Sequence, residues 1–148
     1  MVQKSGTKKK ILVVEDEKML SEMYFDKFFE SGFKVFTAVE AAEGIEIAKK
    51  EKPDLIVLDI LLPRENGIAF LRVLRKETKI SSIPVVVLSN FDSPEIKKEA
   101  FGLGVLDYLI KTNYTPSKTV EKIRSYIDDK RNGKNSNKKH NSISGRKS

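Results

Sequence analysis

The sequence of 148 residues has no cysteine, a single histidine and no long apolar run. Without cysteine there is no disulfide scaffold or thiolate zinc site, which is typical of a protein of the reducing cytoplasm. His140 lies in a polar segment, so a histidine metal site or a Ser-His catalytic pair cannot be assembled. No stretch reaches the roughly 18 apolar residues of a membrane span, and Ile11–Val14 is too short for the core of a signal peptide. We therefore expect a cytoplasmic protein without membrane contact.

The positive charge is concentrated at the two ends of the chain. The net charge is +7, but residues 1–10 carry four lysines and no acid, and residues 130–148 carry seven basic residues and no acid. Residues 11–129 contain 17 basic and 21 acidic residues and are therefore acidic. Lysines suffice for non-specific contacts with nucleic-acid phosphates, but residues 130–148 contain no aromatic residue to stack on a base. The distribution argues against nucleic-acid binding as the main function.

The length suits one domain flanked by two polar segments. The C-terminal segment consists of Asn, Ser, Gly and Lys with one apolar residue, and it cannot bury enough surface to offset the entropy of ordering. We predict a flexible basic N-terminus at residues 1–9, a folded domain at residues 10–131 and a disordered basic tail at residues 132–148.

Within the predicted domain, short apolar segments alternate with amphipathic ones. The apolar segments are rich in β-branched residues, and three are apolar throughout, which is typical of strands buried on both faces of a parallel sheet. The amphipathic segments have apolar residues at helical spacing, and Ser93-Pro94 and Thr115-Pro116 are typical helix starts. The pattern predicts an α/β fold, an open parallel sheet with helices on both faces. The predicted strands are Ile11–Val14, Val35–Ala38, Leu55–Leu58, Val85–Leu88 and Val105–Leu109.

Polar residues follow these strands at the sheet edge where such folds bind ligands. Glu15 and Asp16 follow the first strand, Asp59 the third, Ser89 the fourth and Lys111 the fifth. Carboxylates suit Mg²⁺, an ammonium and a hydroxyl suit the oxygens of a transferring phosphoryl group, and a carboxylate can become an acyl phosphate. Each residue alone could equally be a helix cap, a turn residue or a solvated side chain. Their combination favours phosphoryl chemistry.

Several motifs together resemble the receiver domain of two-component response regulators. ILVVEDE is similar to the first strand and acidic pair, LIVLDILLPRENG to the phosphoacceptor segment, PVVVLSN to the fourth strand and GVLDYLIK to the fifth. The pattern covers about residues 9–130. The resemblance implies a flavodoxin-like (βα)5 fold with strand order 2-1-3-4-5. It also implies a signalling domain that catalyses only its own phosphorylation and dephosphorylation.

The resemblance assigns residues to phosphorylation and to Mg²⁺ binding. Asp59 matches the phosphoacceptor. Glu15 and Asp16 match the Mg²⁺-binding pair, and Asp59 and the backbone carbonyl of Leu61 complete the ligand set. The resemblance implies a histidine kinase or a histidine phosphotransfer protein as the source of the phosphoryl group.

The resemblance also assigns a switch. Ser89 matches the hydroxyl residue that hydrogen-bonds the phosphoryl group, and Lys111 matches the lysine that pairs with it. Tyr108 matches the aromatic residue that turns inward when Ser89 is drawn to the phosphate. The surface formed by the fourth helix, the fifth strand and the fifth helix would then change and bind a downstream partner. A half-buried strand aromatic without a switching role is the alternative for Tyr108.

The sequence departs from the family pattern beside the site. Thr112 follows Lys111, where the family usually has proline in a cis peptide bond; a cis bond before threonine costs about 2.5–4 kcal/mol, so we expect a trans bond. Asn90 replaces the usual alanine and could either crowd Asp59 or donate to the phosphoryl group. Leu61 and Phe91 occupy positions that tune the lifetime of the phosphoryl group in this family. Neither side chain can activate water, and we therefore expect slow dephosphorylation.

Other functions remain open to different degrees. No recognisable output domain follows the predicted last helix, so we expect a stand-alone regulator that binds a partner or relays phosphate, and a homodimer is left open. The alternatives are an adaptor or nucleic-acid-associated protein acting through the basic tail, and a receiver-like domain that never turns over phosphate. Flavin binding is excluded, because the acids at residues 15–17 would repel a phosphate where such proteins bind one.

Overall fold

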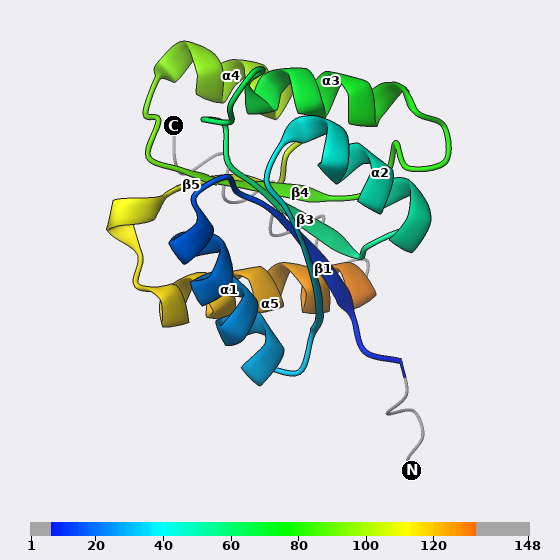
Figure 1. Ribbon diagram of the computed structural model, residues 1–148, viewed down its shortest axis with the longest axis vertical. Coiled ribbons are helices and arrows are strands. Elements are labelled where there is room, and N and C mark those ends of the chain that lie inside the picture. The colour runs from blue at the N-terminus through cyan, green and yellow to red at the C-terminus, as the bar shows by residue number, and fades with distance from the viewer. Residues whose placement is uncertain (1–6, 133–148) are drawn as a thin grey trace.

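A five-stranded parallel sheet lies between two layers of helices in the computed structural model, which describes residues 7–132 (Figure 1). The strand order β2-β1-β3-β4-β5 confirms the predicted flavodoxin-like fold. Most of the predicted flexible N-terminus (residues 1–9) and nearly all of the predicted tail (residues 132–148) lie outside the described residues. The strands are β1 (Lys10–Val14), β2 (Lys34–Ala38), β3 (Leu55–Leu58), β4 (Val85–Ser89) and β5 (Asp107–Ile110). The helices are α1 (Lys18–Glu30), α2 (Ala41–Glu51), α3 (Gly67–Lys76), α4 (Pro94–Gly102) and α5 (Pro116–Asn132).

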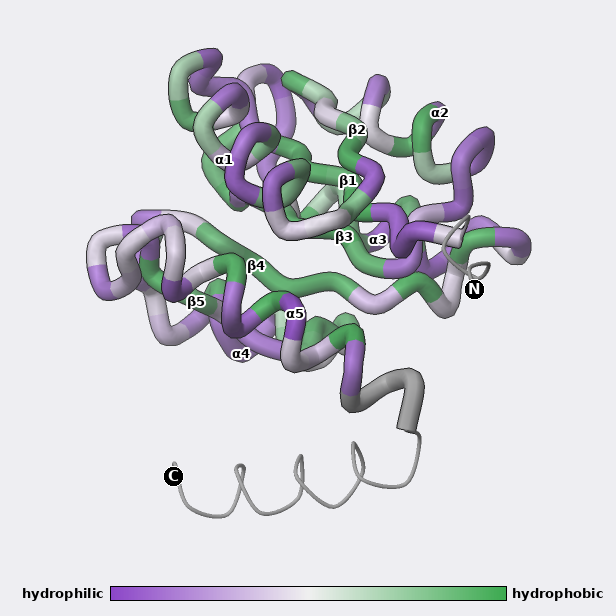
Figure 2. The backbone as a smooth tube through the Cα atoms, turned by 90° about the horizontal axis from the view of Figure 1, so that it is seen from below, coloured by the Kyte–Doolittle hydropathy of each residue, from purple (hydrophilic) through white to green (hydrophobic). Residues whose placement is uncertain are grey.

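The apolar strands form the centre of the molecule, as their sequences predict. Every residue of β3 and β4 is buried. The residues along β1, β3 and β4 are mainly hydrophobic, as the green colour of these strands shows (Figure 2). Helices α2, α3 and α4 cover one face of the sheet, and α1 and α5 cover the other (Figure 1). Two apolar clusters therefore fix the sheet from both sides, as expected of a doubly wound parallel sheet. No helix among residues 7–132 is long and apolar enough to cross a membrane.

The fifth strand begins later than the sequence predicts, at Asp107 instead of Val105. The Val105 N–H donates to the carbonyl of Ala100 at 3.3 Å and closes the turn after α4. The next N–H, of Leu106, donates to the carbonyl of Val85 at 2.8 Å and brings the chain to the sheet. Val105 is buried in the core, so its hydrophobic character reflects packing beneath α4 rather than strand pairing.

Side-chain caps start the fourth and fifth helices where the sequence predicts them. The Ser93 hydroxyl accepts from the N–H of Ile96 at 3.3 Å at the beginning of α4. The Thr115 hydroxyl accepts from the N–H of Lys118 at 3.1 Å at the beginning of α5. Each cap satisfies a backbone donor that has no partner inside the helix, and each is followed by proline at the first helical position.

A close backbone approach at Gly67 shapes the loop between β3 and α3. A Cβ atom at Gly67 would lie 2.7 Å from the backbone oxygen of Asp59 and 2.9 Å from the Cα of Ile60. The Gly67 N–H donates to the carbonyl of Ile60 at 2.8 Å. The loop therefore folds back against the residue that directly follows β3, and only glycine fits at this contact.

Arg75 ties the far end of α4 to the rest of the fold. Its guanidinium donates to the carbonyls of Leu103 at 2.7 Å and Gly104 at 3.3 Å, both just after α4. It also donates to the carbonyls of Ser81 at 3.2 Å and Ile83 at 2.7 Å, in the loop before β4. Burial lowers the pKa of this guanidinium. Arg75 thus joins α3, the entry to β4 and the C-terminal end of α4.

Candidate functional site

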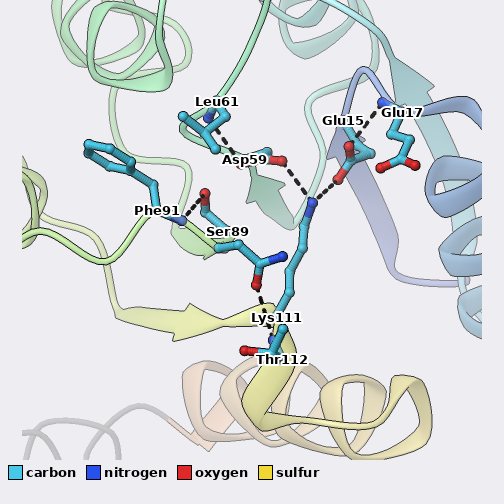
Figure 3. Close-up of polar contacts among 9 residues, drawn as sticks. Glu15, Glu17, Asp59, Leu61, Ser89, Phe91, Lys111 and Thr112 are labelled. Carbon is cyan, nitrogen blue, oxygen red and sulfur yellow. Dashed lines mark hydrogen bonds and ion pairs between the residues drawn. The ribbon is translucent and has the colours of Figure 1, made fainter.

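The polar residues singled out at the strand ends lie at one edge of the sheet (Figure 3). The Lys111 ammonium, directly after β5, donates to Glu15 Oε1 at 2.7 Å and to Asp59 Oδ2 at 2.8 Å. Glu15 directly follows β1, and Asp59 directly follows β3. The Lys111 side chain is 10% exposed, and those of Glu15 and Asp59 are 4% and 5% exposed. Residues separated by up to 96 positions therefore form one buried ionic cluster.

Asp16 completes a group of three carboxylates. Glu15, Asp16 and Asp59 each offer an oxygen, and these three atoms lie within 4.8 Å of one another. Asp16 is exposed to solvent, whereas the other two acids are buried. Lys111 pairs with Glu15 and Asp59, so with all three acids ionised the cluster has a net charge of −2. A divalent cation with oxygen ligands fits that charge and that donor set.

Backbone donors orient the two buried carboxylates. The Leu61 N–H donates to Asp59 Oδ1 at 3.0 Å, and the Glu17 N–H donates to Glu15 Oε2 at 3.0 Å. Each carboxylate thus has one oxygen held by an N–H two residues further along the chain and the other held by Lys111 (Figure 3). Hydrogen bonds of this kind fix the side-chain orientation without a further partner side chain.

Burial and ion pairing act in opposite directions on the cluster. Burial raises the pKa of Glu15, and the hydrogen bond from Lys111 only partly offsets this effect. Burial lowers the pKa of Lys111, but the hydrogen bonds to Asp59 and Glu15 outweigh it and leave the pKa above its ordinary value. Lys111 is therefore a firmly charged ammonium at neutral pH.

Ser89 and Tyr108 contact the same backbone unit, that of Phe91. The Phe91 N–H donates to the Ser89 hydroxyl oxygen at 3.2 Å, and the Tyr108 hydroxyl donates to the Phe91 carbonyl at 2.6 Å. Ser89 is fully buried, and Tyr108 is 8% exposed. Burial, with the negative charges of Asp59 and Asp92, raises the pKa of Tyr108 to about 12.

Sequence reasoning did not identify this bridging role of Phe91. The contacts use its main-chain N–H and carbonyl, which every residue except proline offers, so the side chain carried no signal for them. The family resemblance gives the position two residues after Ser89 only an effect on the lifetime of the phosphoryl group. The side chains of Phe91 and Leu61 are 37% and 51% exposed. In Figure 3 they lie on the side of Asp59 opposite to Lys111 and Glu15.

The peptide bond after Lys111 is trans, as are all peptide bonds in residues 7–132, which confirms the expectation for Thr112. Lys111 still reaches Asp59 and Glu15 from this backbone. The Thr112 N–H donates to Asn90 Oδ1 at 3.1 Å. The Asn90 side-chain oxygen is therefore bound to the loop that carries Lys111.

The sheet order and the two helical layers define a flavodoxin-like α/β protein. The family model of the response regulator receiver domain matches residues 11–124. The chain therefore belongs to the response regulator receiver domain family, whose members take part in two-component signalling and interact with histidine kinases or phosphotransfer proteins.

Curated relatives are about one third identical to the chain over the aligned residues. The alkaline phosphatase synthesis transcriptional regulatory protein PhoP of Bacillus subtilis is 34% identical over 119 residues, 80% of this chain and 48% of that protein. The probable transcriptional regulator ycf27 of Cyanophora paradoxa is 33% identical over 120 residues, 81% of this chain and 48% of that protein. The chain spans about half the length of these relatives.

Solved receiver structures are covered almost completely. The receiver domain of the Francisella response regulator 1452 is 30% identical with a TM-score of 0.74, over 82% of this chain and 98% of that one. The chemotaxis response regulator CheY4 of Vibrio cholerae is 27% identical with a TM-score of 0.73, over 82% of this chain and 99% of that one.

Proposed function

We propose that the chain is a phosphoacceptor signalling domain that receives a phosphoryl group on Asp59 from a histidine kinase or a histidine phosphotransfer protein. One observation carries the proposal: the Lys111 ammonium is joined to Asp59 at 2.8 Å inside a group of three carboxylates. In the transfer, an Asp59 oxygen attacks phosphorus, the P–N bond of the phosphohistidine breaks, and the histidine nitrogen leaves with the bonding pair and takes up a proton. The product is an acyl phosphate.

Mg²⁺ is the metal that the donor set fits. Glu15, Asp16 and Asp59 would hold it with the backbone carbonyl of Leu61, and water would fill the remaining positions. When bound, Mg²⁺ neutralises the charge that develops on the phosphoryl oxygens. The three acids then serve two purposes, since Asp59 is both ligand and nucleophile while Glu15 and Asp16 supply charge.

Lys111 and Ser89 are placed to bind the transferred group. Asp59 Oδ1 accepts from the Leu61 N–H and Oδ2 from Lys111, so the ammonium must pass from the carboxylate to a phosphoryl oxygen as the new bond forms. The Ser89 hydroxyl accepts from the Phe91 N–H, which leaves its own O–H free to donate to the phosphoryl group. Lys111 thereby exchanges one oxygen acceptor for another, and Ser89 gains an acceptor for its O–H.

The proposed switch runs through Phe91. A shift of the Ser89 hydroxyl toward the phosphoryl group would disturb its hydrogen bond with the Phe91 N–H. The carbonyl of Phe91 accepts from the Tyr108 hydroxyl, so the disturbance would reach Tyr108. The Tyr108 ring lies on β5 and is 5.8 Å from the Lys97 ammonium of α4. We therefore assign the surface of α4, β5 and α5 to partner binding. The output is the changed affinity of this surface, so the chain has no substrate other than its phosphoryl donor.

The proposal places the signalling domain at residues 10–131 of a cytoplasmic protein. The relatives named as transcriptional regulators are about twice as long as the part that this chain matches, so the downstream partner of this chain is proposed from the receiver surface alone. The alternative adaptor role depends on the basic tail at residues 132–148, nearly all of which lies outside the described residues.

Mass spectrometry after incubation with acetyl phosphate and Mg²⁺ tests the proposal. We expect the wild type to gain one phosphoryl group, Asp59→Asn to gain none, and the exposed Asp26→Asn control to behave as wild type. Chelation of Mg²⁺ should abolish the adduct. A wild type without a Mg²⁺-dependent adduct, or an adduct that persists in Asp59→Asn, would contradict the assignment of Asp59.

The exposed apolar side chains beside Asp59 predict a long-lived acyl phosphate. Leu61 and Phe91 offer no group that can orient or activate an attacking water. The double variant Leu61→Asn/Phe91→Glu should therefore lose its phosphoryl group about 100-fold faster than the wild type, the lower end of the range for positioned proton-transfer groups. Loss of the phosphoryl mass is followed over time. Equal lifetimes would refute the expectation.

A further inference from the structure

We propose that Asn90 is a positioning residue for phosphorylation, because its side-chain oxygen holds the backbone that follows Lys111 and so keeps the ammonium at Asp59. The inference rests on the proposed function. Its observation is the hydrogen bond from the Thr112 N–H to Asn90 Oδ1 at 3.1 Å, between residues 22 positions apart (Figure 3).

This hydrogen bond lies directly beyond the end of the parallel ladder. The last pair of β4 and β5 is Ser89 with Ile110. The next residue on the β4 side, Asn90, contacts the β5 side through its side chain. The hydrogen bond from the Thr112 N–H to the Asn90 side chain thus links the two chain segments once more after the last backbone pair of β4 and β5.

The turn that follows β5 has little support of its own. Lys111–Asn113 form a single 3₁₀ turn, and the bond from the Tyr114 N–H to the Lys111 carbonyl, at 3.3 Å, closes it. The first N–H groups of such a turn have no partner inside it. Thr112 is exposed, so without Asn90 its N–H would turn to water and the turn would lose its tether to β4.

The tether acts on both predicted phosphoryl-binding residues. Asn90 directly follows Ser89, and Thr112 directly follows Lys111. Lys111 reaches two carboxylate oxygens at 2.7 and 2.8 Å, so a shift of its backbone moves both contacts at once. A misplacement of about 1 Å can cost about 100-fold in rate when geometry controls the reaction.

Positions 90 and 112 are also those at which the sequence departs from its family. The hydrogen bond between Asn90 and Thr112 explains why the two departures occur in the same chain. A proline at position 112 would have no N–H to donate, and an alanine at position 90 would have no oxygen to accept. The Asn90 side-chain oxygen is therefore engaged with Thr112, and only the amide N–H groups of Asn90 could donate to a phosphoryl group.

A double-mutant cycle tests the inference through the rate of phosphorylation by acetyl phosphate at saturating Mg²⁺. We expect Asn90→Ala to slow phosphorylation about fivefold, equivalent to the loss of about 1 kcal/mol of transition-state stabilisation. Thr112→Pro removes the donor and also restricts the backbone, but the backbone effect is the same in both backgrounds. The additional slowing by Thr112→Pro should therefore be about fivefold smaller in the Asn90→Ala protein than in the wild type.

The Lys111 ammonium supplies a readout that does not depend on phosphorylation. Its NMR signal should be observable in the wild type, because two carboxylates and burial slow its exchange with water, and should be lost in Asn90→Ala. Asn113→Ala, a nearby exposed asparagine in the same turn, serves as the matched control and should change neither signal nor rate. Additive effects in the cycle, or a wild-type signal and rate in Asn90→Ala, would overturn the inference. A wild type that accepts no phosphoryl group but shows the signal and its loss would refute only the proposed function.

Discussion

Replacing Lys111 with methionine removes the positive charge of the ionic cluster and preserves most of its volume. The ammonium lies 2.7 Å from Glu15 Oε1 and 2.8 Å from Asp59 Oδ2, and all three side chains are at most 10% exposed. The variant leaves two buried carboxylates close together without a counter-ion. Breaking a buried pair in this way costs about 3–5 kcal/mol, because the remaining charge is desolvated and uncompensated. We expect a loss of that size in the free energy of unfolding at pH 7.

Lys97→Met provides the matched control for this loss. Lys97 pairs with Asp92 at the same N–O distance of 2.7 Å, but the two side chains are 36% and 61% exposed. An exposed pair contributes about 0.2–1 kcal/mol. The Lys97 ammonium also lies 5.8 Å from the Tyr108 ring, a contact of similar weight at an exposed site. The difference in unfolding free energy between Lys111→Met and Lys97→Met therefore reports the effect of burial, because the N–O distances of the two ion pairs are nearly equal.

Urea unfolding in the absence and presence of Mg²⁺ is the assay. Mg²⁺ should recover part of the loss in Lys111→Met, because the ion supplies the missing positive charge to the acids and binds the folded state. Glu15→Gln introduced into Lys111→Met should also recover part of it by removing one of the buried charges. A loss in Lys111→Met no larger than that in Lys97→Met would refute the reasoning that burial makes this pair indispensable.

The pH dependence of stability follows from the same cluster. The pKa of Lys111 is raised above 10.5, so its contribution is complete below that pH and is lost as the pH rises through the folded-state pKa. The pKa of Glu15 is raised above 4.5 by burial, so its ionisation lowers stability as the pH rises through that window. The deficit of Lys111→Met relative to wild type should therefore shrink as the pH falls toward 4.5. Unfolding curves across pH 4–11 measure both effects.

Two further substitutions probe the surroundings of the site. Gly67→Ala should destabilise the fold by about 1–3 kcal/mol, because its Cβ would lie 2.7 Å from the backbone oxygen of Asp59. Gly102→Ala, whose Cβ would have nothing within 4 Å, should be neutral or stabilising. Urea unfolding measures both free energies, and equal effects would contradict the close contact at Gly67. Tyr108→Phe removes the hydroxyl that donates to the Phe91 carbonyl at 2.6 Å, and should cost about 1 kcal/mol. It should also increase amide hydrogen exchange in the loop after β4, and unchanged exchange would contradict the link.

The fold and the members of the site were predictable because both follow from local signals. Strands buried on both faces read as apolar runs, and β3 has the predicted bounds, Leu55–Leu58. The parallel sheet then places the residues after β1, β3 and β5 at one edge, which accounts for the contacts of Lys111 with Glu15 and Asp59. The roles of these residues in phosphorylation remain predictions that the experiments above address.

The connections within the site were not predictable, since they depend on tertiary geometry. The bond between Asn90 and Thr112 joins residues 22 positions apart, and neither residue type signals the other. The link through Phe91 uses main-chain groups common to nearly all residues. The late start of β5 has a similar cause. Val105 is buried beneath α4, so its apolar side chain suggests a strand, but its N–H closes a turn.

Two of the four carbonyl contacts of Arg75 fasten the C-terminal end of α4. The clamp joins the residues just after α4 to α3 and to the entry of β4. The opposite end of α4 follows the loop of Phe91 and begins with the Ser93 cap. We therefore expect a displacement of α4 to be smallest at its C-terminal end. The amide protons of α4 should therefore exchange with solvent most slowly at the end that Arg75 holds.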